Sequence, residues 1–151
     1  MTQTVLTPER TYKSIHATSK KRVLEQGSHL FGKLVDDEAS YNIFSAFIER
    51  EKKGSTAIGS GIAMPHSSSE LVDSAVAVFF ALNTGVDFEA ADEKPVDLFL
   101  MMLVPSNECP QYAKVLSDFR TKLLQPGFAD KLREAPSSEA LYELLQEQGI
   151  T

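Results

Sequence analysis

The run VDLFLMMLV, residues 96–104, decides how the rest of this chain has to fold. It is almost continuously apolar, and so is AVAVFFAL at residues 75–82. Strands with one face in water alternate apolar and polar residues, whereas uninterrupted apolar runs rich in β-branched and aromatic residues are typical of strands buried on both faces. Both runs are therefore predicted to be central strands of a sheet.

Segments with helical spacing of apolar residues stand before and after these two strands. The predicted helices cover about residues 19–34, with Ser19 as the N-cap, about 38–52, about 111–124, a short segment after Pro126 and Gly127, and a last segment from about residue 137. Turn-forming residues at 83–85 and 92–95 are expected to separate the strands. The chain has no internal repeat and no long linker, so residues 1–151 are predicted to form one α/β domain.

Net charge, apolar runs and cysteine content argue against several classes of protein. The 151 residues carry a net charge of -6, which works against nucleic-acid binding, and the basic cluster at residues 20–22 is predicted to be the solvated face of a helix. The N-terminal segment has no apolar signal region, and the longest apolar run is too short to cross a bilayer. Cys109 is the single cysteine, so no internal disulfide can form. We expect a soluble cytoplasmic protein that neither binds nucleic acid nor inserts into a membrane.

The glycine-rich stretch GSTAIGSGIAMPH, residues 54–66, departs from several known chemical motifs. A phosphate-binding P-loop would need Lys and Ser or Thr where Ser60 and Gly61 stand, and a dinucleotide fingerprint would need glycine at Met64. A serine-hydrolase elbow would need glycine at Ile58. The other histidines, His16 and His29, lie in separate segments, and no cysteine pair is present, so neither a metal nor a cofactor is expected.

A nucleophilic histidine remains as the chemical interpretation of this stretch. Imidazole is largely unprotonated at neutral pH, which leaves one ring nitrogen with a lone pair that can accept a phosphoryl group. The transferring oxygens would need cations and hydrogen-bond donors around them. The candidate residues are His66 as nucleophile, the guanidinium of Arg50, the hydroxyls of Ser55 and Thr56, and backbone N–H groups at Gly59 and Gly61.

The same residues also fit a purely structural interpretation. The glycines would then shape a hairpin, Arg50 would be a solvent-exposed helix end, and His66 would be a structural histidine after Met-Pro. Spacing alone leaves both interpretations open.

The segment REKKGSTAIGSGIAMPH, residues 50–66, resembles in order and spacing the signature of the fructose/mannitol-type enzyme IIA domains of the bacterial phosphoenolpyruvate-dependent phosphotransferase system. Three further segments are similar to the nitrogen-regulatory branch of that family, namely SKKRVLE at residues 19–25, KPVDLFLMMLVP at 94–105 and SSEALYELL at 137–145. The resemblance covers nearly the whole chain.

The resemblance implies a central mixed β-sheet flanked by helices on both faces, and a phosphotransferase role that is regulatory rather than metabolic. It implies that His66 accepts a phosphoryl group from a histidine-containing phosphocarrier protein, with Arg50 and Thr56 beside the phosphate. Two departures stand out. Tyr112 occupies the place of the second histidine that the family usually has near the first, and Ser67 and Ser68 replace the usual glycine and basic residue.

Three functions follow as expectations. The first is a regulatory phosphocarrier whose phosphorylation state selects its partners. The second, suggested by Tyr112 and the two serines, is a binding module that keeps the fold without being phosphorylated. A sugar-specific transport component ranks third, because no transport segment is present in these 151 residues.

Overall fold

Strand β6 (Val96–Pro105) lies in the middle of the sheet and is hydrogen-bonded to strands on both of its edges. In this computed structural model, residues 5–35, 37–106 and 109–151 are described. The expected domain start at residue 1 and the side chain of Cys109 therefore lie outside the described residues. The second predicted central strand is β5 (Val76–Val86), which runs antiparallel to β6.

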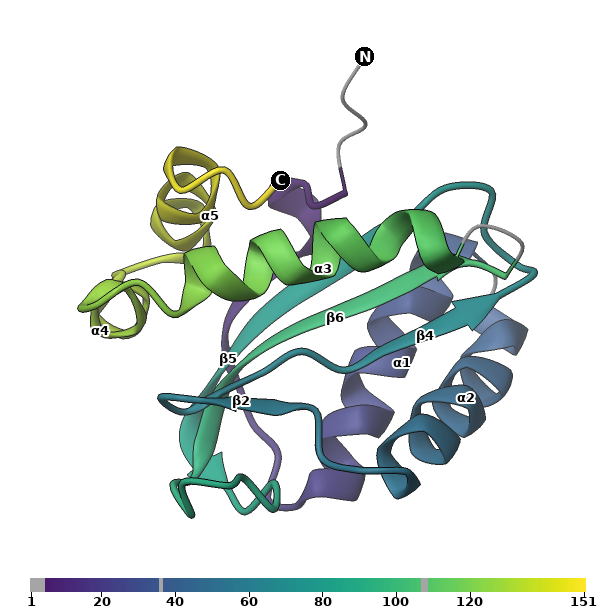
Figure 1. The fold of residues 1–151 in the computed structure, drawn as a ribbon, viewed down its shortest axis with the longest axis horizontal. Helices are drawn as coiled ribbons and strands as arrows, with labels where there is room; N and C mark the ends of the chain where they lie inside the picture. Colours follow the sequence, from purple (N-terminus) through teal and green to yellow (C-terminus); the bar gives the residue numbers. More distant parts are fainter. Residues whose placement is uncertain (1–4, 36, 107–108) are drawn as a thin grey trace.

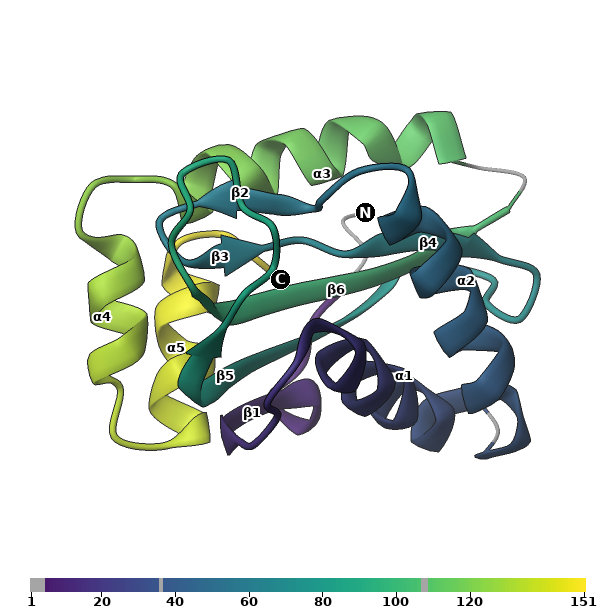
Figure 2. The ribbon, with the colours of Figure 1, turned by 90° about the horizontal axis from the view of Figure 1, so that it is seen from below.

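Four short strands complete the sheet in the described part of the chain. They are β1 (Thr11–Ile15), β2 (Ala57–Gly59), β3 (Ile62–Ala63) and β4 (His66–Ser69). The strand order is β1-β5-β6-β3-β2, and β4 also pairs with β6 (Figure 2). Since β1 is parallel to β5 while β5 is antiparallel to β6, the sheet is mixed, as expected.

Helices cover both faces of this sheet (Figure 1). One layer contains α1 (Lys20–Val35) and α2 (Ser40–Lys52), and the other contains α3 (Cys109–Leu123), α4 (Phe128–Glu134) and α5 (Ser138–Glu147). Short 3-10 helices precede β1 (Pro8–Arg10) and α2 (Asp37–Ala39). The predicted N-cap is confirmed, because the Ser19 hydroxyl accepts a hydrogen bond from the Arg22 N–H at 3.2 Å.

The side chains of β6 alternate between two hydrophobic cores. Leu98, Leu100 and Met102 pack with α3, α4 and α5, whereas Phe99, Met101 and Leu103 pack with α1 and α2. This alternation is the geometry of a strand whose two faces are both buried. The expectation of one α/β domain with a sheet covered on both faces is confirmed.

The expected turn at residues 83–85 is wrong. Strand β5 continues through these residues to Val86, and the chain turns at residues 87–95 instead. The pairing of β5 with β6 shifts register between Ala81 and Val86. An irregularity of this kind accommodates turn-forming residues within a strand.

Close packing at the tip of the β2–β3 hairpin restricts which residue can stand at position 61. Gly61 has a φ of 75°, and a Cβ at this position would collide with Nη2 of Arg133 and lie 3.1 Å from Oδ1 of Asp97. Gly127 also has a positive φ, 81°, but a Cβ there would have nothing within 4 Å.

We predict that Gly61→Ala lowers the free energy of unfolding by more than Gly127→Ala does. Both variants place a side chain in a left-handed conformation, at about 1 to 2 kcal/mol, and only Gly61→Ala adds an overpacking cost of about 1 to 3 kcal/mol. Urea unfolding of the two variants and the wild type measures the difference. Equal losses in both variants would show that Arg133 and Asp97 do not constrain the hairpin.

Candidate functional site

His66 is the first residue of β4 and is fixed to the centre of the sheet. It pairs in register with Met102 of β6, and the carbonyl of Pro65 accepts a hydrogen bond from the Met102 N–H at 3.0 Å. The ring is half-buried, and its Nδ1 lies 2.9 Å from the carbonyl oxygen of Met64. A carbonyl can only accept, so this contact assigns the proton to Nδ1 and leaves the lone pair on Nε2.

A pocket of about 290 Å³ surrounds this histidine. Its walls come from the end of α2, the segment around β2, and helix α3, which runs alongside that edge of the sheet (Figure 2). The lining residues are Arg50, Ser55, Thr56, Ala57, Ile58, Met64, His66, Leu116, Ser117 and Arg120. The structure thus brings the four predicted residues Arg50, Ser55, Thr56 and His66 to one cavity, and adds Arg120, which sequence reasoning missed.

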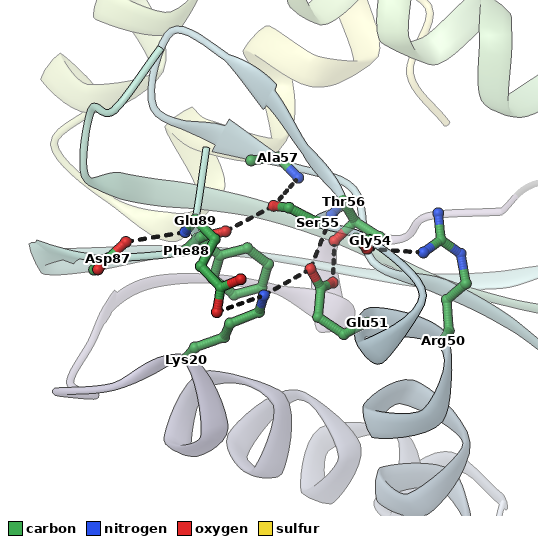
Figure 3. A network of polar contacts seen from close by, with 10 residues as sticks. All are labelled: Lys20, Arg50, Glu51, Gly54, Ser55, Thr56, Ala57, Asp87, Phe88 and Glu89. Atoms are coloured by element: carbon green, nitrogen blue, oxygen red, sulfur yellow. Dashed lines mark hydrogen bonds and ion pairs between the residues drawn. The ribbon is translucent and has the colours of Figure 1, made fainter. Parts of the chain in front are cut away.

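Arg50 lies in the last turn of α2, where it holds the loop that follows. Its Nη1 donates a hydrogen bond to the carbonyl of Gly54 at 3.0 Å, as Figure 3 shows. No carboxylate lies within ion-pair distance of Arg50 in the described part of the chain. The guanidinium has further N–H groups that remain available to an anion.

A buried ionic network joins the end of α2 to the segment that follows it (Figure 3). Glu51 accepts hydrogen bonds from the Thr56 hydroxyl at 2.5 Å and from the Thr56 N–H at 2.9 Å, and Nζ of Lys20 lies 3.0 Å from the same carboxylate. Lys20 also lies 4.9 Å from the ring centroid of Phe88. Because a buried carboxylate needs a cation and hydrogen-bond donors, Lys20 and Thr56 hold Glu51 in place and thereby fix the loop of the site.

The prediction that Lys20 belongs to a solvated helix face is therefore wrong. Its side chain is only 19% exposed, because it reaches across to the buried Glu51 of the neighbouring helix. Glu51 was missed by sequence reasoning, although it stands inside the quoted motif, next to Arg50. The sequence feature that could have pointed to Glu51 is its position shortly before the Gly-Ser-Thr segment.

The hydroxyl protons of Ser55 and Thr56 are both engaged within the protein. Ser55 donates to the carbonyl of Phe88 at 2.6 Å, and Thr56 donates to Glu51. Both residues line the pocket, but each hydroxyl proton is directed to another group. In this arrangement the two hydroxyls shape the loop, and their protons are not free to be donated to an anion.

Two glycines of the motif, Gly59 and Gly61, lie outside this pocket. Gly59 and Gly61 flank the tip of the β2–β3 hairpin, where the N–H of Ser60 donates to Asp92 at 3.2 Å and Arg133 donates to the Ser60 carbonyl at 2.6 Å. They do not line the pocket of His66. The expectation that their N–H groups approach a phosphate is wrong, and the hairpin interpretation of these glycines is confirmed.

Tyr112 is 9% exposed and packs in the core that β6 forms with α3, α4 and α5. It is not among the residues that line the pocket, where α3 instead presents Leu116, Ser117 and Arg120. These residues lie one and two turns further along the helix. Ser67 and Ser68 belong to β4, where they pair with Leu103 and Val104 of β6.

Metal-binding clusters and membrane-spanning helices are both absent from the described residues, 5–35, 37–106 and 109–151. No three His, Cys, Asp or Glu side chains among them come together in a way that would hold a metal ion. No helix in this part of the chain has the length and apolar character needed to cross a membrane.

Comparison with known proteins gives a consistent result. The family described as "Phosphoenolpyruvate-dependent sugar phosphotransferase system, EIIA 2" matches residues 4–148. A nitrogen regulatory protein of Pseudomonas aeruginosa is 37% identical over 141 residues, which cover 93% of this chain and 92% of that protein. One of Klebsiella oxytoca is 41% identical over 146 residues, covering 96% and 90%. The crystal structure of nitrogen regulatory protein IIA-Ntr from Neisseria meningitidis superposes with a TM-score of 0.87 at 30% identity, covering 93% of this chain and 96% of that one.

We predict that Lys20→Met destabilises the fold far more than Lys52→Met. Removing the cation beside the buried Glu51 is expected to lower the free energy of unfolding by about 3 kcal/mol, the lower end for a broken buried pair, since Lys20 keeps some contact with solvent. Lys52 pairs with Glu49 at the same 3.0 Å, but both side chains are about two-thirds exposed, so its loss is expected to cost about 0 to 1 kcal/mol. Chemical denaturation compares them, and similar small losses would contradict the account of Glu51.

Proposed function

Since the chain belongs to the EIIA 2 family of the phosphoenolpyruvate-dependent sugar phosphotransferase system, we propose that it is a phosphohistidine carrier in which His66 accepts a phosphoryl group from a histidine-containing phosphocarrier protein. The observation that carries this proposal is the hydrogen bond from Nδ1 of His66 to the Met64 carbonyl. This bond to a backbone carbonyl holds the imidazole ring and leaves Nε2 as the nucleophile. Arg50 lines the same pocket.

The phosphoryl transfer needs no additional base to accept a proton. The Nε2–P bond forms as the donor N–P bond breaks, and the bonding pair returns to the donor nitrogen. The donor imidazole, protonated on its other nitrogen, leaves as a neutral ring, and His66 keeps its proton on Nδ1. Negative charge spreads over the three phosphoryl oxygens during the transfer, and the Arg50 guanidinium can donate to two of them.

We propose that the phosphoryl group serves regulation rather than sugar uptake. The relatives from Pseudomonas aeruginosa and Klebsiella oxytoca are nitrogen regulatory proteins that match this chain over nearly their whole length. A dianionic group in place of a neutral ring changes the charge and hydrogen bonding of the surrounding surface, which can create or abolish a contact with a partner protein. The protein would act in the cytoplasm on protein partners, and its net charge of -6 speaks against nucleic acid as a target.

One observation favours a second function, that of a regulatory binding module that is not phosphorylated. The hydroxyl protons of Ser55 and Thr56 are committed to Phe88 and Glu51, so two of the expected donors are withheld from a phosphate. Such a module would bind its partners equally well as wild type, His66→Ala and His66→Glu. A phosphorylation-dependent regulator would distinguish at least one of these three forms in a pulldown.

We predict that the wild-type protein gains the mass of one phosphoryl group when incubated with phosphoenolpyruvate, enzyme I and the phosphocarrier. The added mass should be acid-labile, because it sits on a histidine nitrogen, and it should be absent from His66→Ala. Intact-protein mass spectrometry is the measurement. A folded wild-type protein that gains no mass would leave the binding module as the better description.

A further inference from the structure

Helix α3 supplies one wall of the His66 pocket through Leu116, Ser117 and Arg120. Leu116 and Ser117 lie four and three residues before Arg120, about one helical turn, so both are its neighbours on the surface of α3. Side chains on a helix lean towards its N-terminus, which directs the long side chain of Arg120 over the turn that carries Leu116 and Ser117. Arg120 therefore reaches along the wall that α3 contributes to the pocket, whereas Arg50 comes from the end of α2.

Arg120 differs from the other arginines in its partners. Arg22 pairs with Glu25 at 2.7 Å, Arg133 pairs with Asp97 at 2.9 Å, and Arg10 donates to the carbonyls of Val5 and Ala77. No hydrogen bond or ion pair engages the Arg120 side chain within the described part of the chain. The acidic residue nearest to it in sequence on α3, Asp118, is paired with Lys122 at 2.8 Å.

The residues that line the pocket carry positive charge, whereas the chain as a whole is negative. The lining contains two arginines and no aspartate or glutamate, although the protein as a whole carries a net charge of -6. The buried carboxylate of Glu51 lies behind Thr56 and is paired with Lys20. The pocket is thus a local site for an anion, in which Arg50 and Arg120 provide N–H donors.

We propose, on the basis of the proposed phosphorylation of His66, that Arg120 is a second catalytic residue, which binds the phosphoryl oxygens from the α3 side while Arg50 binds them from the α2 side. Two guanidinium groups supply the donors that Ser55 and Thr56 do not offer, since those hydroxyl protons are engaged. Because the charge on the oxygens develops during transfer, the contact with Arg120 strengthens in the transition state.

The test is the kinetics of phosphoryl transfer from the protein phosphocarrier to four variants and the wild type. Arg120→Gln removes the charge and keeps a long side chain, and Arg120→Lys keeps the charge without the planar fork. Arg50→Lys is the comparison on the α2 side. Lys114→Gln is the matched control, because it removes one positive charge from an exposed position of the same helix outside the pocket.

Arg120→Gln is expected to lower kcat about tenfold or more with KM within twofold of wild type. Arg120→Lys should lie in between, and Lys114→Gln should keep the wild-type kcat, all at matched melting temperatures. An unchanged kcat for Arg120→Gln, or a change in KM alone, overturns the inference, the latter because it would make Arg120 a docking contact for the donor protein. A wild-type protein that accepts no phosphoryl group overturns the proposed function itself, and this inference with it.

Discussion

Strand β6 has no face in water, and the arrangement of the other elements follows from that constraint. Its side chains enter two cores, so one helical layer must lie on each side of the sheet. Its two edges must also be paired, because unpaired backbone groups in the interior cost free energy. One edge is covered by β5, and the other by β3 and β4. His66 begins β4, so the ring proposed to accept the phosphoryl group is attached to the buried central strand β6.

Beside His66, the loop of residues 54–56 is held by a buried charge. Glu51 binds both the backbone and the hydroxyl of Thr56 and is neutralised by Lys20 from α1. The network ties α1, α2 and the loop together without placing a carboxylate in the lining of the pocket. The proposed phosphoryl site would gain from both effects, because the loop is held by hydrogen bonds and the pocket keeps its positive charge.

The two long strands and most helices could be predicted from sequence, because apolar runs and helical spacing are local signals. Strand β4 could not, since HSSS has no apolar pattern and is a strand only because it pairs with β6. The motif at residues 50–66 correctly grouped Arg50 with His66, since a short loop connects them. The roles of Lys20 and Arg120 depend on how α1 and α3 pack against that loop, which no local pattern records.

In the proposed mechanism the Met64 carbonyl holds the proton on Nδ1 and so makes Nε2 of His66 the acceptor of the phosphoryl group. Long-range proton–nitrogen NMR spectra of the phosphorylated protein, with its histidines labelled with nitrogen-15, distinguish the two ring nitrogens. We expect coupling to phosphorus at Nε2 of His66, with the proton retained on Nδ1. A phosphoryl group on Nδ1, or on any residue other than His66, would contradict this mechanism.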